Sequence, residues 1–213
     1  MVRFDSKTDW NQALRPLLKK YKGRKHPLDY RNPFQLLVMV VLSARDSDRN
    51  INAKAPALFE KFPSMQSLAG AMPEDLFPFI QGITNFRNKA KWLTEAARRI
   101  RNDENIPRSL EEWIQYPGIG RKSANVIMSQ MNQPAEGVIV DIHSVRVAPR
   151  LGMATGTNPE KIEKQLMPKV VRKNWHALGM SLTYLGREIC RPAKPDCPKC
   201  VMKKVCRFYN SRN

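Results

Sequence analysis

The chain has 213 residues, with 37 Lys and Arg against 19 Asp and Glu, and its formal net charge is +18. A protein this basic attracts polyanions, so nucleic acid is the first expected partner and an anionic membrane surface is the second. The hydrophobic fraction of 42% excludes a disordered basic tail. The lack of any apolar run of about 18 residues excludes a bilayer-spanning helix.

Helical periodicity dominates the chain from its first third onward. Over residues 33–44 the apolar side chains recur at the spacing of one helix face, and Asn32 followed by Pro33 fits an N-cap and a first helical position. Further helices are predicted over residues 52–62, from Ser64 or Ser67 and from Pro73 to about Ile80, and over residues 89–102, 109–116, 158–170 and 175–190.

Local signals refine several of these elements. The helix over residues 89–102 is predicted to carry its basic residues on the outer face. Ser109, with a glutamate three residues later, fits a capping box. Residues 136–145 (EGVIVDIHSV) are β-branched but have no partner run, so we expect an extended segment entering a helix that Asp141 caps and Pro149 ends or kinks. The predicted fold class is all-α.

The stretch Pro117-Gly118-Ile119-Gly120 lies between two predicted helices. Its glycines permit positive φ and close backbone approach. The N–H groups at the start of the next helix can bind a phosphate without reading a base. The stretch is typical of a helix-hairpin-helix element in which these residues and Arg121 contact DNA. An ordinary helical hairpin, where Gly is also common, is the alternative.

Lys122 lies in the first turn of that next helix, on the side opposite a core face of Ala124, Ile127, Met128 and Met131. A solvated or phosphate-contacting lysine is one interpretation. The other is a nucleophile, because the positive end of the helix dipole and the adjacent Arg121 disfavour an ammonium group there. Both effects make a neutral, reactive amine easier to obtain.

Asp141 in VIVDIHSVR also has two interpretations. Aspartate is a preferred N-cap, and that role alone explains the residue. The alternative is a catalytic carboxylate held at the start of a helix, facing a DNA-bound sugar.

All four cysteines lie in one short window with the spacing Cys190-x6-Cys197-x2-Cys200-x5-Cys206. Structural zinc sites usually show two short pairs, whereas one CxxC with longer arms favours an iron–sulfur cluster modestly over zinc. Clustered cysteines also indicate a reducing compartment. The loop is basic, so it can be a structural staple, a contact to the DNA backbone, or both. Its lysines are Lys194, Lys199, Lys203 and Lys204.

From about Asn32 to Cys206 the sequence resembles the endonuclease III branch of the helix-hairpin-helix DNA glycosylases. The resemblance is carried by PGIGRKSAN, VDIHSVRV and the cysteine spacing, in that order. It implies two helical domains with a DNA-binding cleft between them. Residues 26–134 would form a six-helix domain with the hairpin. Residues 1–25 and 135–213 would form a second domain, in which the four cysteines hold a [4Fe-4S] cluster.

The resemblance also implies base excision chemistry on double-stranded DNA that contains damaged bases or abasic sites. A damaged nucleotide is flipped out of the stack. Lys122 then attacks C1′ and expels the base, while Asp141 stabilises charge on the sugar and assists proton transfers. The resulting imine permits β-elimination on the 3′ side. His143 and Lys199 are further expected DNA contacts.

Two positions depart from the pattern of the family. Arg45 stands where endonuclease III relatives usually have Gln, and Asn85 stands where a Leu wedge is usual. Apolar wedges help to keep a flipped base out of the stack. Polar residues at both positions are expected to contact DNA and to shift the lesion preference, unless Ile83 or Phe86 takes the wedge role.

The first functional hypothesis is therefore a DNA glycosylase and abasic-site lyase for oxidised pyrimidines. The alternatives are a glycosylase of the same superfamily for a mismatched or alkylated base, and a non-catalytic DNA-binding iron–sulfur protein. The N-terminal sequence MVRFDSKTDW lacks the apolar core of a secretory signal. We expect a monomer in the cytoplasm, associated with the nucleoid.

Overall fold

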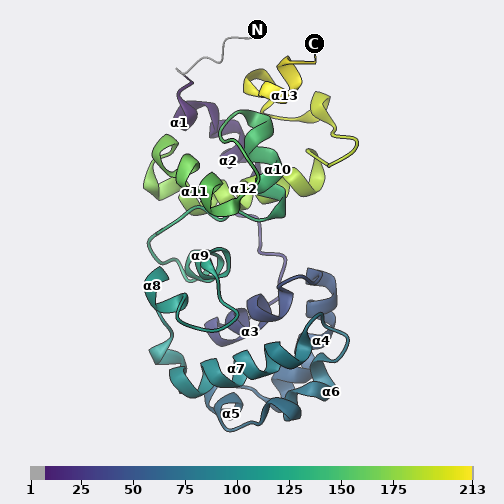
Figure 1. Cartoon of the computed structure of the whole chain (residues 1–213), viewed down its shortest axis with the longest axis vertical. Coiled ribbons are helices and arrows are strands. Elements are labelled where there is room, and N and C mark those ends of the chain that lie inside the picture. The colour runs from purple at the N-terminus through teal and green to yellow at the C-terminus, as the bar shows by residue number, and fades with distance from the viewer. Residues whose placement is uncertain (1–7, 213) are drawn as a thin grey trace. The chain divides into compact units, whose positions relative to one another are not determined.

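A computed structural model describes residues 8–212 (Figure 1). Its internal contacts divide the chain into two compact units, Lys25–Gln133 and Met1–Arg24 with Pro134–Asn213. We call the first the hairpin unit and the second the cysteine unit. Each division falls one residue before the boundary expected from the sequence. Residues 8–212 contain no β-strand, so the predicted all-α class is confirmed.

The hairpin unit is a bundle of mostly short helices. Its elements are α3 (Pro33–Ser43), α4 (Asp48–Lys61), α5 (Met65–Ala69), the 3-10 helix η1 (Pro73–Leu76), α6 (Phe77–Ile80), α7 (Phe86–Ile100), the 3-10 helix η2 (Asp103–Asn105), α8 (Leu110–Trp113) and α9 (Arg121–Gln130).

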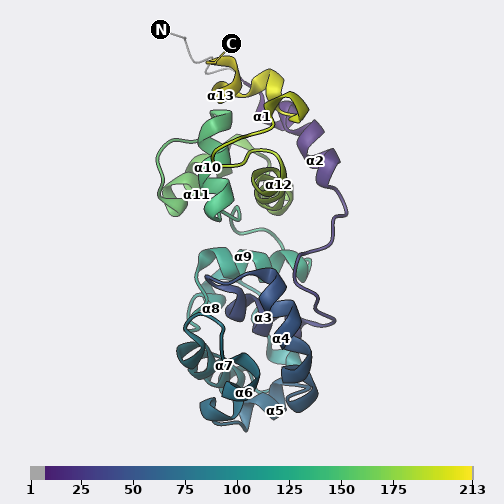
Figure 2. The ribbon, with the colours of Figure 1, turned by 90° about the vertical axis from the view of Figure 1, so that its right-hand side faces the viewer.

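Helix α3 lies at the centre of the hairpin unit and packs against α4, α7 and α9 (Figure 2). It begins as predicted, because the Asn32 side chain accepts a hydrogen bond from Gln35 N at 2.8 Å and Pro33 is its first residue. The predicted one-sided apolar face is an underestimate, since Leu36, Met39 and Val40 are buried as well. Neighbours on several sides require a helix that is apolar nearly all round.

Several helix starts are fixed by their own side chains. The choice between Ser64 and Ser67 is resolved in favour of Ser64, whose hydroxyl caps α5. The capping box of Ser109 and Glu112 at α8 is confirmed. Helix α4 begins at Asp48, earlier than residue 52, because Ser47 provides its N-cap.

One expectation about α7 is wrong. Lys91, Arg98 and Arg99 are exposed, but Lys89 is only 2% exposed and does not lie on the outer face. Its Nζ donates to Leu42 O at 2.7 Å and to Ala44 O at 2.6 Å. A buried ammonium is tolerated here because backbone carbonyls replace its water.

The cysteine unit combines the N-terminal helices with the last third of the chain. Its elements are α1 (Trp10–Ala13), α2 (Arg15–Tyr21), α10 (Ile142–Leu151), α11 (Pro159–Leu166), the 3-10 helices η3 (Met167–Lys169) and η4 (Arg172–Asn174), α12 (Trp175–Glu188), the 3-10 helices η5 (Cys197–Lys199) and η6 (Lys203–Val205), and α13 (Arg207–Asn210).

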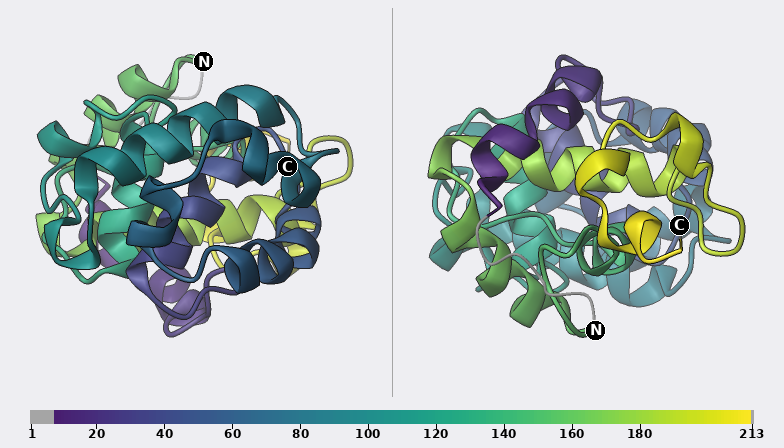
Figure 3. Two further views of the ribbon diagram at one scale, coloured as in Figure 1. Left: turned by 90° about the horizontal axis from the view of Figure 1, so that it is seen from below. Right: turned by 90° about the horizontal axis from the view of Figure 1, so that it is seen from above.

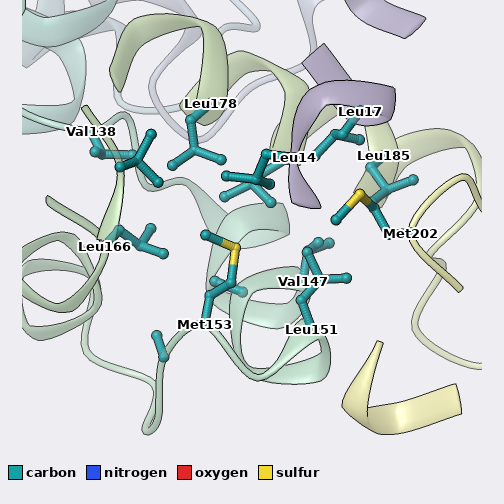
Figure 4. Close-up of a cluster of buried hydrophobic side chains, with 14 of the residues drawn as sticks. Leu14, Leu17, Val138, Val147, Leu151, Met153, Leu166, Leu178, Leu185 and Met202 are labelled. Carbon is teal, nitrogen blue, oxygen red and sulfur yellow. The ribbon is translucent and has the colours of Figure 1, made fainter. Parts of the chain in front are cut away.

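One apolar core joins these distant segments (Figure 4). Leu14 and Leu17 from the N-terminal helices are fully buried with Val147 of α10 and Leu185 of α12. Helix α2 lies along α12, as the right-hand view of Figure 3 shows. Burial of apolar surface thus explains why the N-terminal segment packs with the end of the chain.

Helix α10 departs from the prediction at Pro149. The helix does not end there but continues to Leu151, where Gly152 follows with φ of 92°. A proline in the last turn removes only one N–H near the end of the ladder, so the left-handed glycine ends the helix instead.

Within residues 8–212 no helix is both long and apolar enough to span a bilayer.

Candidate functional site

The turn between α8 and α9 depends on Gly118. This residue has φ of 80°, and a Cβ atom built on it would lie 2.4 Å from Cε3 of Trp92 on α7. Any side chain would therefore strain the backbone and collide with the indole ring. Ile119, the next residue, is buried, which anchors the tip of the turn. Trp92 could not be identified from the sequence because its contact is tertiary.

Gly120 behaves differently from Gly118. It is the N-cap of α9 with φ of −90°, so the expectation that both glycines use positive φ is wrong for this one. A Cβ on Gly120 would meet nothing within 4 Å. Neither the fold nor the backbone conformation therefore requires glycine here. The open space at the start of a helix suits the close approach of an anion.

The orientation of the turn is set from α7. The Arg99 guanidinium lies 4.2 Å from the centroid of the Tyr116 ring and donates to Gln115 O at 2.9 Å. Tyr116 also packs near the fully buried Trp113, with their ring centroids 5.9 Å apart. Side chains of α7 and α8 therefore fix the residues that lead into the hairpin.

Lys122 lies in the first turn of α9 and is exposed, as predicted. Ala124, Ile127 and Met128 are fully buried on the core face, while Met131 at the C-cap is half-buried. Arg121, just before the lysine, is also half-buried, and its carbonyl accepts from Asn125 Nδ2 at 3.0 Å. The lysine thus lies at the positive end of a helix that is rigidly packed on its opposite side.

Asp141 is the N-cap of α10, which confirms the structural part of its prediction. Its Oδ1 accepts from His143 N at 2.9 Å and from Ser144 N at 2.8 Å. Both capping bonds use this one oxygen, so Oδ2 lies outside the cap. The carboxylate is half-buried, and the next residue, Ile142, is 77% exposed. The second oxygen is therefore the one that can meet a ligand, and the catalytic role stays a prediction.

His143 is held by its own helix. The Arg146 guanidinium approaches His143 Nδ1 at 3.2 Å and donates to Gly186 O at 2.8 Å and to Cys190 O at 2.9 Å. Helices α10 and α12 approach so closely that a Cβ on Gly186 would lie 2.7 Å from His143 Cβ. Arg146, which sequence reasoning missed, thus links the start of α10 to the first cysteine. The DNA contact of His143 stays a prediction.

The four cysteines line one pocket of the cysteine unit and are unpaired thiols. Burial raises the pKa of the Cys200 and Cys206 thiols, and the neighbouring cysteines raise it further. Within residues 8–212, no three Cys, His or carboxylate groups are gathered as a single metal ion requires. Four thiols around one pocket fit a larger cluster better than a single zinc ion.

Arg150 closes the side of this pocket. Its Nη1 donates to Cys190 Sγ at 3.5 Å and to Arg191 O at 2.8 Å. Its guanidinium lies 4.6 Å from the centroid of the Phe208 ring, and its carbonyl accepts from Cys206 Sγ at 3.4 Å. The first and last cysteines are therefore held to one residue of α10, a connection that the cysteine spacing did not reveal.

Lys199 in the cysteine loop is exposed but not isolated. Its Nζ lies 2.9 Å from Asp196 Oδ2, and its side chain is 80% exposed. An exposed pair of this kind offsets part of the positive charge that the lysine offers a phosphate. Its DNA contact stays a prediction.

Arg45 and Asn85 lie on two exposed loops of the hairpin unit, and each has φ of 59°. Ile83 is 2% exposed and belongs to the core, so it is wrong as an alternative wedge. Phe86 is half-buried, with its ring centroid 5.2 Å from that of Phe77. Asn85 is therefore the exposed residue at this tip. The DNA contacts of Arg45 and Asn85 stay predictions.

Comparison with known proteins covers most of the chain. The family described as HhH-GPD superfamily base excision DNA repair protein matches residues 38–173. Endonuclease III of Synechocystis sp. is 36% identical over 192 residues, which are 89% of this chain and 88% of that protein. Endonuclease III of Thermotoga maritima is 34% identical over 94% of this chain and 93% of its own.

Solved structures give the same result. A trapped endonuclease III–DNA covalent intermediate, an estranged-adenine complex, superposes with a TM-score of 0.83 at 32% identity, covering 94% of this chain and 95% of that chain. A thermostable thymine-DNA glycosylase shares the fold, with a TM-score of 0.78 at 22% identity over 92% of this chain and 94% of its own. The chain therefore belongs to the HhH-GPD superfamily of base excision DNA repair proteins, within the endonuclease III family.

Proposed function

We propose that this protein removes oxidised pyrimidines from duplex DNA through an imine between Lys122 and C1′ of the damaged nucleotide. The chain is a base excision repair DNA glycosylase and abasic-site lyase, and its endonuclease III relatives include proteins solved in complexes with DNA. The observation that carries the proposal is the exposed Lys122 in the first turn of α9, beside the open backbone of Gly120.

The reaction requires a lesion nucleotide outside the duplex, because C1′ cannot be reached inside the stack. The Lys122 amine forms a bond to C1′ as the bond from C1′ to the base breaks, and the base leaves with a proton. Loss of a proton from nitrogen and opening of the sugar ring give the imine. Removal of a 2′ hydrogen then breaks the C3′–O bond and cuts the strand on the 3′ side.

Each residue of the site has a separate part in this sequence. The N–H groups of α9 beside Gly120 hold a phosphate, which places the sugar next to the amine. Asp141, through the oxygen outside its cap, stabilises positive charge on the sugar and assists the proton transfers. The excess of basic residues attracts the duplex before this docking occurs.

Reductive trapping tests the proposal. When the protein is mixed with an abasic-site duplex and borohydride, we expect a covalent adduct whose mass and peptide map place the DNA on Lys122. Lys122→Ala should give no adduct, although it still binds the duplex. An adduct on another side chain would contradict the imine assignment. Normal duplex binding without any wild-type adduct would favour a non-catalytic DNA-binding protein.

The same assay can be extended to identify the lesion. Duplexes that carry one oxidised pyrimidine, one mismatched base or one alkylated base should differ in the rate at which the base is released. We expect the oxidised pyrimidine to be released fastest. Faster release of a mismatched or alkylated base would replace this substrate with another of the same superfamily.

We further propose that Cys190, Cys197, Cys200 and Cys206 hold a [4Fe-4S] cluster. When bound, the cluster would supply a rigid cross-link that pins the basic loop to α10 and α12. The proposal is supported by the shared pocket of the four thiols. A positively charged iron cluster would also favour thiolates at the two cysteines whose pKa burial raises.

Elemental analysis tests the cluster proposal. Protein purified without oxygen should contain about four iron and four sulfide per chain and absorb broadly near 400 nm, as protein-bound iron–sulfur cubes do. Cys200→Ala should lose both the iron and the colour. Colourless protein with stoichiometric zinc would contradict the assignment.

We also propose that the protein acts as a monomer in the cytoplasm, on DNA of the nucleoid. Its charge of +18 favours continuous association with DNA and disfavours association with a second copy of the same chain.

A further inference from the structure

The loops that carry Arg45 and Asn85 are joined by a direct hydrogen bond. We define the Arg45 loop as residues 44–47 and the Asn85 loop as residues 82–85. Asp46 Oδ2 accepts from the backbone N–H of Thr84 at 2.8 Å. The other carboxylate oxygen of Asp46 accepts from Ser47 N at 2.8 Å and from Asn50 Nδ2 at 2.9 Å. One carboxylate therefore fixes its own loop and holds the backbone of the second.

Lys89 joins the same two segments from beneath. It lies in the first turn of α7, and its N–H donates to Asn85 O at 3.1 Å. Its buried Nζ donates to carbonyls at the end of α3, those of Leu42 and Ala44. Ala44 directly precedes Arg45, so the start of α7 and the end of α3 are tied within a few residues of both exposed side chains.

These ties matter because both loop tips have a backbone conformation that side chains disfavour. Arg45 and Asn85 each have φ of 59°, which is uncommon outside glycine and persists where the surroundings enforce it. Asn85 also closes on its own helix, since its Oδ1 accepts from Asn88 Nδ2 at 2.8 Å. Two exposed polar residues in this conformation, on loops bonded to each other, form one rigid surface.

We propose that Asp46 and Lys89 are positioning residues that hold Arg45 and Asn85 as a single unit for contact with duplex DNA, an inference that rests on the proposed function. Without the bond from Thr84 to Asp46, the two loops could move independently, and each would meet the duplex in several orientations. A contact made by the pair needs both prongs in place at once, so misplacing one of them weakens both.

The test compares cleavage of one abasic site in duplex DNA with cleavage of the same site in a single strand. Asp46→Ala is expected to slow duplex cleavage on the order of tenfold, since a misplaced positioning group can cost up to ~10²-fold. Single-strand cleavage should stay within about twofold, because a single strand requires no contact with paired bases. Lys89→Gln should act in the same direction.

Asp75→Ala is the matched control. Asp75 belongs to the same unit, and its Oδ2 accepts from the Met72 backbone N–H at 2.8 Å, a bond of the same kind and length as that of Asp46. This variant loses the same charge and a comparable bond elsewhere, so its duplex to single-strand ratio should equal that of wild type. Asp46→Asn, which keeps an acceptor oxygen for Thr84, should recover most of the duplex rate.

A positioning role has one consequence that a role in stability alone lacks. In a background of Arg45→Ala with Asn85→Ala, Asp46→Ala should change the duplex rate no further. Additive losses, equal slowing on both substrates, or a normal duplex rate for Asp46→Ala would overturn this inference alone. Wild-type protein that cleaves neither substrate would overturn the proposed function, and this inference with it.

Discussion

Replacing Asp141 with asparagine is expected to slow base excision by about 10²–10⁴-fold, the range in which a positioned acid or base contributes. The change removes the charge that would stabilise the sugar and the group that would accept a proton. It does not remove the helix cap, because Asn serves as an N-cap about as well as Asp. Activity and stability are therefore separable at this residue.

The measurement is single-turnover release of the damaged base, together with thermal unfolding of the same samples. Asp141→Asn should melt near wild type, with loss of the charge at the start of α10 costing about 0.3–1 kcal/mol. Asp141→Ala should lose activity and also about 1 kcal/mol of stability, because Oδ1 no longer accepts from His143 and Ser144.

Trapping at a preformed abasic site adds a second readout. No base has to be expelled from that substrate, so Asp141→Asn should still form some adduct on Lys122 while its excision of an intact lesion nearly disappears. A full excision rate for Asp141→Asn would mean that the carboxylate only caps α10.

The sequence predicted well those features whose causes are local. Asn32, Ser109 and Asp141 cap their helices through bonds to residues two or three positions away, a relation that the sequence displays directly. The outward direction of Lys122 followed from the core face of one helix in the same way. These elements need no knowledge of the rest of the fold.

Features that depend on distant partners were missed or wrong. Lys89 has the spacing of an exposed lysine, but its partners Leu42 and Ala44 lie more than 40 residues earlier. The role of Gly118 was predicted from its flexibility, whereas the contact with Trp92 also requires it. Helical periodicity reports which side of a helix is apolar and carries no information about which backbone atoms a polar side chain will meet.

The two glycines of the hairpin provide a test that separates folding from DNA binding. Gly118→Ala should destabilise the protein by about 2–5 kcal/mol. A left-handed conformation costs an ordinary residue roughly 1–2 kcal/mol. Overpacking costs typically a further 1–3 kcal/mol, and here the new methyl group would lie 2.4 Å from Cε3 of Trp92. Such a loss is a large fraction of the ~5–15 kcal/mol by which domains are usually stable.

Gly120→Ala should give the opposite result. Its backbone conformation is ordinary and its Cβ would enter open space, so unfolding should change by little more than the weak capping of alanine, about 1 kcal/mol or less. A phosphate held at the start of α9 would meet that methyl group, and the Kd for duplex DNA should rise about tenfold, a factor that corresponds to ~1.4 kcal/mol.

Urea unfolding and duplex titration on both variants make the comparison. In a Trp92→Ala background, the cost of Gly118→Ala should fall by the part that comes from the collision and keep the part that comes from φ of 80°. The size of the remaining cost measures the backbone strain directly. If Gly120→Ala instead unfolds the protein and leaves the Kd of the surviving fraction unchanged, then the space beside Gly120 does not receive a phosphate, and the docking of the sugar next to Lys122 must have another cause.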